Sequence, residues 1–144
     1  MSFDLKLKNG DISILNGQLE TVQDKDKLIQ DILKIAITPA GSNVFNPWYG
    51  SFISKTLIGS HLDTAIITDA AENQLRTSIT TLQALQGIQL ESFQKLSAEE
   101  QLAAIVGILV QRNDTDPRLF IVKITVLDRT YNKVQTSFTV SGFL

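Results

Sequence analysis

The sequence predicts an α+β fold: helices packed on one face of a C-terminal three-stranded antiparallel meander, preceded by a small N-terminal β-meander. Three observations support this prediction. Residues 1–22 alternate apolar and polar side chains around two Asn-Gly pairs. Two later segments repeat apolar residues with the period of a helix. The end of the chain holds three β-branched runs separated by short polar turns.

The length of 144 residues is that of one domain, which would bury roughly two-thirds of its extended-chain surface. We divide this domain into an N-terminal β-meander over 1–22, a helical part over 23–103 and a C-terminal β-sheet over 104–144.

Composition narrows the functional classes. With a net charge of −2, the chain lacks the excess of basic residues that is typical of nucleic-acid binders, and we expect no nucleic-acid partner. The sequence contains no run of 18 apolar residues, so we predict no membrane span. The first residues lack the pattern of a signal peptide, and we expect the protein to fold in a cytoplasm. The absence of cysteine excludes disulfides, thiolate metal sites and cysteine nucleophiles. The single histidine, His61, is interpreted as a surface or capping residue. We therefore expect no catalytic residue, no metal site and no cofactor.

The first helix is predicted over Asp24–Ile37, because its apolar residues fall on one broad face. Such an apolar helix is either sandwiched within the domain or shared with a partner. A segment rich in aromatic residues follows, and it includes Pro47, Trp48, Tyr49 and Gly50. This segment is either an irregular loop that plugs the core or a docking loop for another protein.

The longest helix is predicted over 63–86, with Gly87 as its stop and an outer ion pair between Glu72 and Arg76. Residues 88–96 are open to assignment as loop or short helix. Ser97 and Glu100 have the spacing of a capping box, which predicts a short helix before a strand over 105–110.

The corner Asp116-Pro117-Arg118 leads into a β-branched strand over 119–127. Proline suits a strand entrance, because its φ is fixed and it has no N–H. On local chemistry alone the corner is a hairpin turn that presents a carboxylate and a guanidinium. Residues 133–144 then alternate polar and apolar side chains and form the third strand.

The last predicted strand has an outer edge that lacks the usual protection. Its one charge is Lys133 at the start, and its outward positions are neutral β-formers. Either the N-terminal meander or a helix covers this edge, or a strand from a partner pairs with it. The strand-acceptor residues in the second case are these: Val134, Gln135, Thr136, Ser137, Phe138, Thr139, Val140 and Ser141.

Four features in order resemble the baseplate wedge or sheath initiator family of contractile phage tails, which has relatives in type VI secretion. A helix runs into Ile37-Thr38-Pro39-Ala40-Gly41, similar to the family's leucine-threonine-x-x-glycine segment. Pro47-Trp48-Tyr49-Gly50 resembles its proline-x-aromatic-glycine loop, and a long helix follows. Asp116-Pro117-Arg118-Leu119 resembles its glutamate-proline-arginine-leucine signature, with aspartate in place of glutamate. The similarity extends from about residue 20 to the end.

The resemblance implies a structural part of a virion tail baseplate, present in several copies in a sixfold ring. It implies that Asp116, Pro117 and Arg118 contact the core bundle of the larger wedge subunits. It also implies that the C-terminal sheet accepts strands from the tail sheath protein, with tube or hub proteins as further candidate partners. A tailocin or a secretion machine would use an equivalent component.

Some members of this family carry a lysozyme name, which raises an enzymatic alternative. Glycoside hydrolysis generally needs two carboxylates about 5–9.5 Å apart across a cleft. The available acids are explained by helix caps or solvated helix faces, and we expect no enzyme. They are Asp63, Asp69, Glu72, Glu91, Glu99 and Glu100.

Overall fold

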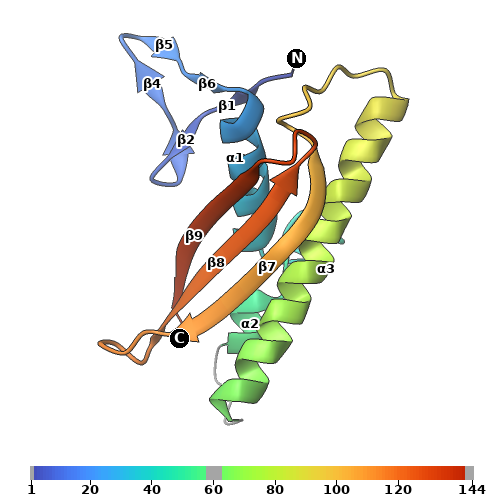
Figure 1. Ribbon diagram of the computed structural model, residues 1–144. Coiled ribbons are helices and arrows are strands. Elements are labelled where there is room, and N and C mark those ends of the chain that lie inside the picture. The colour runs from blue at the N-terminus through green and yellow to red at the C-terminus, as the bar shows by residue number, and fades with distance from the viewer. Residues whose placement is uncertain (1, 58–62, 142–144) are drawn as a thin grey trace.

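The computed structural model describes residues 2–57 and 63–141, and within them the predicted α+β architecture is confirmed. A three-stranded antiparallel sheet lies in front of two long helices, and short hairpins stand at one side (Figure 1). The helices are α1 (Asp24–Ile37), α2 (Ile53–Leu57) and α3 (Thr64–Glu91). The sheet strands are β7 (Leu102–Arg112), β8 (Leu119–Asp128) and β9 (Lys133–Ser141).

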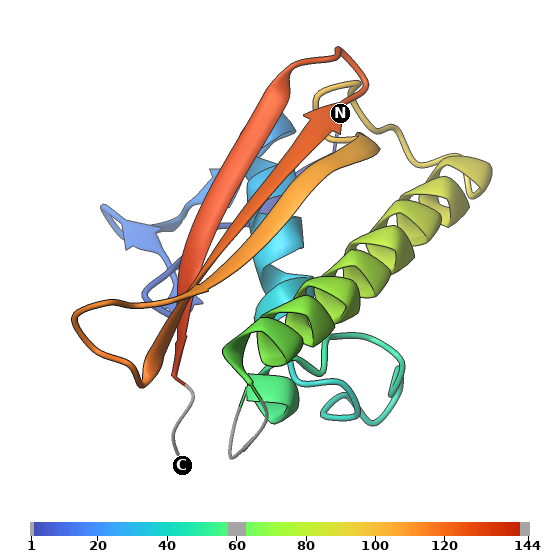
Figure 2. The same ribbon diagram turned by 60° about the horizontal axis from the view of Figure 1, so that its bottom comes forward.

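The sheet has the order β7-β8-β9, so β8 is central and both neighbours are edge strands. Strand β8 pairs with β9 without a register shift, from Leu119 opposite Ser141 to Leu127 opposite Lys133. Its pairing with β7 has irregularities near Leu102 and Ile105. The inner positions of β8 are almost fully buried. Helices α1 and α3 lie on the same face of the sheet (Figure 2). The core of the domain therefore lies between this sheet face and the two helices.

The N-terminal part consists of six two-residue strands: β1 (Asp4–Leu5), β2 (Leu7–Lys8), β3 (Asp11–Ile12), β4 (Ile14–Leu15), β5 (Gln18–Leu19) and β6 (Thr21–Val22). The predicted Asn-Gly turns are confirmed, since Asn9 and Asn16 both have positive φ. The strands form two hairpins, β2–β3 and β4–β5, closed by a β1–β6 pair rather than joined in one continuous sheet.

Gln30 of α1 holds this small unit. Its side chain accepts a hydrogen bond from Leu7 N at 2.9 Å and donates to Leu5 O at 2.8 Å. Lys34 of α1 also pairs with Asp4. Burial raises the pKa of the Asp4 carboxyl, but the hydrogen bond and the charge of Lys34 outweigh burial and lower that pKa overall. Polar contacts thus fix hairpins that are too short to be stable alone.

Helix α1 has the bounds that the apolar period predicts, but the end of α3 was predicted wrongly. Gly87 does not stop the helix, which continues to Glu91. A Cβ at Gly87 would meet nothing within 4 Å, so no close packing requires glycine there. The left-handed residue that ends the helix is Phe93, with φ of 62°.

Two further predictions around α3 and β7 were wrong. Ser97 and Glu100 do share the capping hydrogen bond, Ser97 N to Glu100 Oε2 at 3.0 Å, but a single turn follows in place of a helix. The Ser97 hydroxyl donates to Asp24 instead, at 2.8 Å. As a result β7 begins at Leu102, earlier than the predicted strand. The one-turn helix α2 was not predicted, and His61 and residues 142–144 lie outside the described residues.

Candidate functional site

The outer edge of β9 carries all the predicted strand-acceptor residues, Val134 to Ser141. The ladder bonds reveal which backbone groups face this edge. Asp128 N donates to Asn132 O on the β9 side, while Leu119 O accepts from Asn113 N on the β7 side. Because successive residues of an antiparallel strand face opposite neighbours, the even-numbered residues of β9 bond to β8. The N–H and C=O groups of Gln135, Ser137 and Thr139 therefore point away from the sheet.

No strand covers these outward groups within the described residues. From Lys133 to Val140, the backbone of the described chain has no hydrogen bond besides the ladder with β8. The N-terminal hairpins pair among themselves and not with β9. Helix α1 contacts β9, but no described hydrogen bond joins this helix to the backbone from Lys133 to Val140. The edge is available as a template for an added strand.

The outer edge of β7 is different, because side chains of α3 bind its backbone. Glu72 accepts from Val110 N at 3.1 Å, and Gln86 accepts from Leu102 N at 2.8 Å. Gln83 donates to Ala103 O at 3.1 Å. The predicted ion pair between Glu72 and Arg76 was therefore wrong: Glu72 turns to the sheet, and no such pair is among the ion pairs of the described residues. The sequence analysis did not predict that side chains of α3 bind the backbone of β7.

The core is also incompletely covered beside β9. Along β8 the inner side chains are at most 2% exposed, from Phe120 to Val126. Along β9 Val134 is buried, but Phe138 and Val140 are only partly buried. The side chains of the core thus become more exposed toward the open edge.

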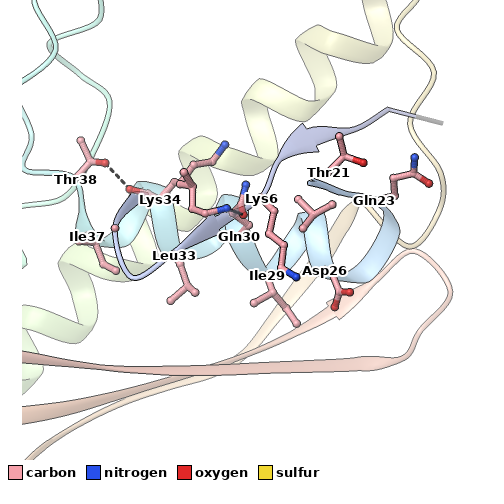
Figure 3. Close-up of a pocket in the computed structure, with 13 residues that line it drawn as sticks. Lys6, Thr21, Gln23, Asp26, Ile29, Gln30, Leu33, Lys34, Ile37 and Thr38 are labelled. Atoms are coloured by element: carbon pink, nitrogen blue, oxygen red, sulfur yellow. Dashed lines mark hydrogen bonds between the residues drawn. The ribbon is translucent and has the colours of Figure 1, made fainter. Parts of the chain in front are cut away.

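A groove of about 1020 Å³ lies along α1, between this helix and the N-terminal hairpins. Figure 3 shows Ile29, Leu33 and Ile37 projecting from the same side of α1. Ile37 is 54% exposed. Asp26 is the one carboxylate among the lining residues. The apolar stripe on α1 is part of the predicted broad apolar face, for which the sequence left open burial within the domain or sharing with a partner.

The predicted corner lies at the tip of the β7–β8 hairpin, at the end of the sheet where β9 finishes. Arg118 binds Asp116 through two hydrogen bonds, Nε to Oδ1 at 2.9 Å and Nη2 to Oδ2 at 3.1 Å. The hydrogen bond from the Arg118 side chain lowers the pKa of Asp116. Pro117 precedes β8 as expected of a strand entrance. The guanidinium remains largely exposed, so the tip presents a compact, charge-paired corner to solvent.

The aromatic loop between α1 and α2 has a fixed base and an exposed tip. Ser51 N donates to Thr38 O at 2.9 Å, and Ser78 of α3 donates to Gly50 O at 2.9 Å. Gly50 has φ of 116°, and a Cβ there would lie 2.4 Å from Thr38 O, so only glycine fits.

The tip of that loop does not plug the core. Phe45 is 92% exposed and Trp48 is 53% exposed, while Tyr49 alone of the aromatic residues here packs partly against the core. The exposed rings lie next to Pro47 in the sequence, and docking of another protein to this loop stays a prediction.

None of the candidate catalytic acids lines the groove along α1. Glu72 is engaged with β7, and Glu100 is 1% exposed and accepts hydrogen bonds from Ser97 N and Ser2 Oγ. Asp63, Asp69, Glu91 and Glu99 line no described groove. No cluster of potential metal ligands is found among residues 2–57 and 63–141. The helices that the structure describes include none with the length and apolarity to cross a bilayer.

Comparison with known proteins finds a solved structure with a similar fold. No family model matches the chain, and no curated protein matches it. A solved structure of a candidate tail lysozyme from Geobacter sulfurreducens is similar, with a TM-score of 0.60 and 12% sequence identity. The similarity covers 81% of this chain and 88% of that chain. At this identity the similarity establishes a shared fold.

Proposed function

We propose that this chain is a structural component of a contractile phage tail baseplate, where it joins the wedge core bundle to the sheath. In this role the outer edge of β9 accepts strands of the sheath protein and nucleates sheath assembly. The observation that carries the proposal is the difference between the two edges of the sheet. Side chains of α3 bind the backbone of β7, whereas no strand pairs with the outer edge of β9 within the described residues. The tail name of the structurally similar Geobacter protein and the motif order around Pro47 and Pro117 agree with it.

The energies of strand addition favour an assembly over a binary complex. Each ladder hydrogen bond contributes about 0.5–1.5 kcal/mol net, while ordering the incoming segment costs roughly 1–2 kcal/mol per residue. One strand on one edge is thus close to break-even without side-chain burial. A ring of copies raises the effective concentration of each strand, and the contacts then reinforce one another.

In the same proposal the Asp116-Pro117-Arg118 corner contacts the larger wedge subunits. Its position at the tip of a two-stranded projection makes it accessible, and the internal ion pair fixes the guanidinium. The exposed tip near Trp48 supplies a second docking surface. A tailocin or a type VI secretion-like machine would use the chain in the same way.

The competing function is peptidoglycan cleavage, and the name of the Geobacter protein is the observation in its favour. The groove along α1 has one carboxylate, Asp26, where a glycosidase generally needs two. A peptidoglycan-clearing assay with the purified chain separates the two functions. Clearing that is abolished by a single Glu→Gln substitution would replace the structural role with an enzymatic one.

The proposed function is tested with Ser137→Pro in a reconstituted tail system. Proline at this position removes an outward N–H and leaves the β8 ladder intact, so folding is retained. We expect the variant to enter the wedge complex but to leave the sheath unpolymerised, as judged by electron microscopy. Normal sheath growth from baseplates that contain Ser137→Pro would refute strand acceptance on this edge.

The wedge contact has its own test in Arg118→Glu. This substitution places like charges at the corner and should prevent co-purification with the larger wedge subunits. If Arg118→Glu co-purifies as well as the unmodified chain, the corner is only a turn. Deletion of residues 133–144 is a weaker test, because it also removes the buried Val134 from the core.

A further inference from the structure

The open edge of β9 and the groove along α1 together define the chemistry of the segment that completes the sheet. Phe138 and Val140 on the inner face of β9 are partly buried, and Ile29 of α1 is partly buried against the same core. Since α1 lies against β9 (Figure 1), a fourth strand on the β9 edge would extend over the outer side of α1. Its inward side chains would then meet the helix surface formed by Ile29 and Leu33, which are partly buried, and Ile37, which is exposed.

The stripe on α1 has a spacing that suits a strand. Ile29, Leu33 and Ile37 follow one another every four residues, which is a rise of about 6.0 Å along a helix. Alternate residues of a strand are about 6.6–6.8 Å apart and point to the same face. Over three residues the two repeats remain nearly in step, so three inward side chains can each pack beside one residue of the stripe.

The charges around the groove are already satisfied, except at one end. Lys34 binds Asp4 and lies 3.2 Å from Asp31, and Lys6 lies 3.4 Å from Glu20. Asp26, at the N-terminal end of the stripe, is exposed and has no ion pair within the described residues. The groove therefore favours neutral or apolar groups along its length and a cation at the Asp26 end.

We infer that the β9 edge and the α1 groove form one site for an extended segment of another polypeptide with apolar residues at alternate positions. The inward side chains pack on Ile29, Leu33 and Ile37, and a basic residue lies near Asp26. This inference rests on the proposed strand acceptance, and it adds the sequence pattern that the incoming strand must have. Apolar burial on α1 supplies the stabilisation that ladder hydrogen bonds alone lack.

The inference is tested by NMR on the full chain with two synthetic nine-residue peptides at millimolar concentration. One alternates leucine with threonine and ends in lysine; the other has the same composition with its leucines consecutive. We expect the alternating peptide to bind about tenfold more tightly, because only it can place every leucine on the helix. Its binding should shift the methyl signals of Ile29, Leu33 and Ile37 and slow amide exchange at Ser137 and Thr139.

Ile37→Gln should weaken binding of the alternating peptide about tenfold, because it removes one apolar contact of the stripe. Ile66→Gln on α3 is the matched control, since Ile66 and Ile37 are both 54% exposed, and it should leave binding unchanged. Equal weakening by both substitutions would overturn the role of the stripe.

The possible failures separate the inference from the proposed function. One outcome is slowed amide exchange at Ser137, equal affinity for both peptides and unchanged methyl signals. It would overturn the role of the α1 groove and leave strand acceptance intact. Shifted methyl signals without slowed exchange would place the peptide in the groove unpaired and would overturn the inference. No response of either signal to the alternating peptide would overturn it as well. Neither result bears on the proposed function, which relies on many copies acting together and is decided by sheath growth with Ser137→Pro.

Discussion

The two edges of the sheet are chemically unequal, although each is formed by one strand bound to β8. On the β7 edge, Glu72, Gln83 and Gln86 of α3 bind backbone groups that another strand would otherwise bind. On the β9 edge, no described side chain does so between Lys133 and Val140. Three polar residues of one helix therefore occupy backbone groups along one edge of the sheet, and the described part of the other edge has no such contacts.

The largest stability effect is expected from removing the Gln86 side chain, which binds the backbone at the buried end of β7. Gln86 is 5% exposed, and it bonds both to Leu102 N and to Glu100 O. Gln86→Ala leaves two buried backbone groups unpaired, and we expect a loss of about 2–3 kcal/mol in the free energy of unfolding. Urea denaturation measures it, with Asn73→Ala on the exposed side of α3 as the control. A loss no larger than in the control would mean that Gln86 does not guard the edge.

A smaller effect is expected at the other end of the same edge. Glu72→Ala removes the acceptor of Val110 N and should cost about 1 kcal/mol, while Glu72→Gln retains an acceptor oxygen and should be nearly neutral. Amide exchange at Val110 should accelerate in the alanine variant only. If both variants behave alike, the negative charge of Glu72 and not its hydrogen bond is what matters.

The smallest effect concerns the N-terminal hairpins that α1 holds in place. Asp4→Asn should cost about 0.5 kcal/mol at pH 7, because the pair with Lys34 is partly exposed. Since folding lowers the pKa of Asp4, its contribution is full above the unfolded value of about 3.9 and disappears as pH falls through the lower folded value.

The pH dependence of that variant is measured by urea denaturation in parallel with the unmodified chain. The difference in unfolding free energy between the two should shrink toward zero in acid. Asp114→Asn, at an exposed loop residue without a hydrogen-bonded carboxylate, is the control. A difference that stays constant with pH would show that Asp4 acts by packing and not by charge.

Much of the fold was predictable, because periodic apolar residues determine it. The bounds of α1, the Asn9 and Asn16 turns and the strand after Pro117 follow from local patterns and were confirmed. The open side of the sheet was also visible in the neutral residues of β9 as one of two alternatives. Whether a partner fills it remains a proposal.

The rest depends on tertiary contacts that no local pattern contains. Glu72 and Gln86 look like ordinary polar helix residues. They bind the outer backbone groups of β7 only because the fold places this strand beside α3. Gly87 looks like a helix stop, yet it does not adopt the positive φ of one, and the helix continues to Glu91. The exposure of Trp48 depends on how Gly50 anchors the loop to Thr38, which the motif alone does not specify.

The most direct test of the central claim is residue-resolved amide hydrogen exchange on the isolated chain, which needs no partner. The account predicts an alternation along β9: rapid exchange at Gln135, Ser137 and Thr139, and slow exchange at Thr136 and Phe138. Val110 on the guarded edge should exchange slowly as well. If Ser137 and Thr139 were as protected as Val110 in the isolated chain, the edge would already be covered, and the account would be contradicted.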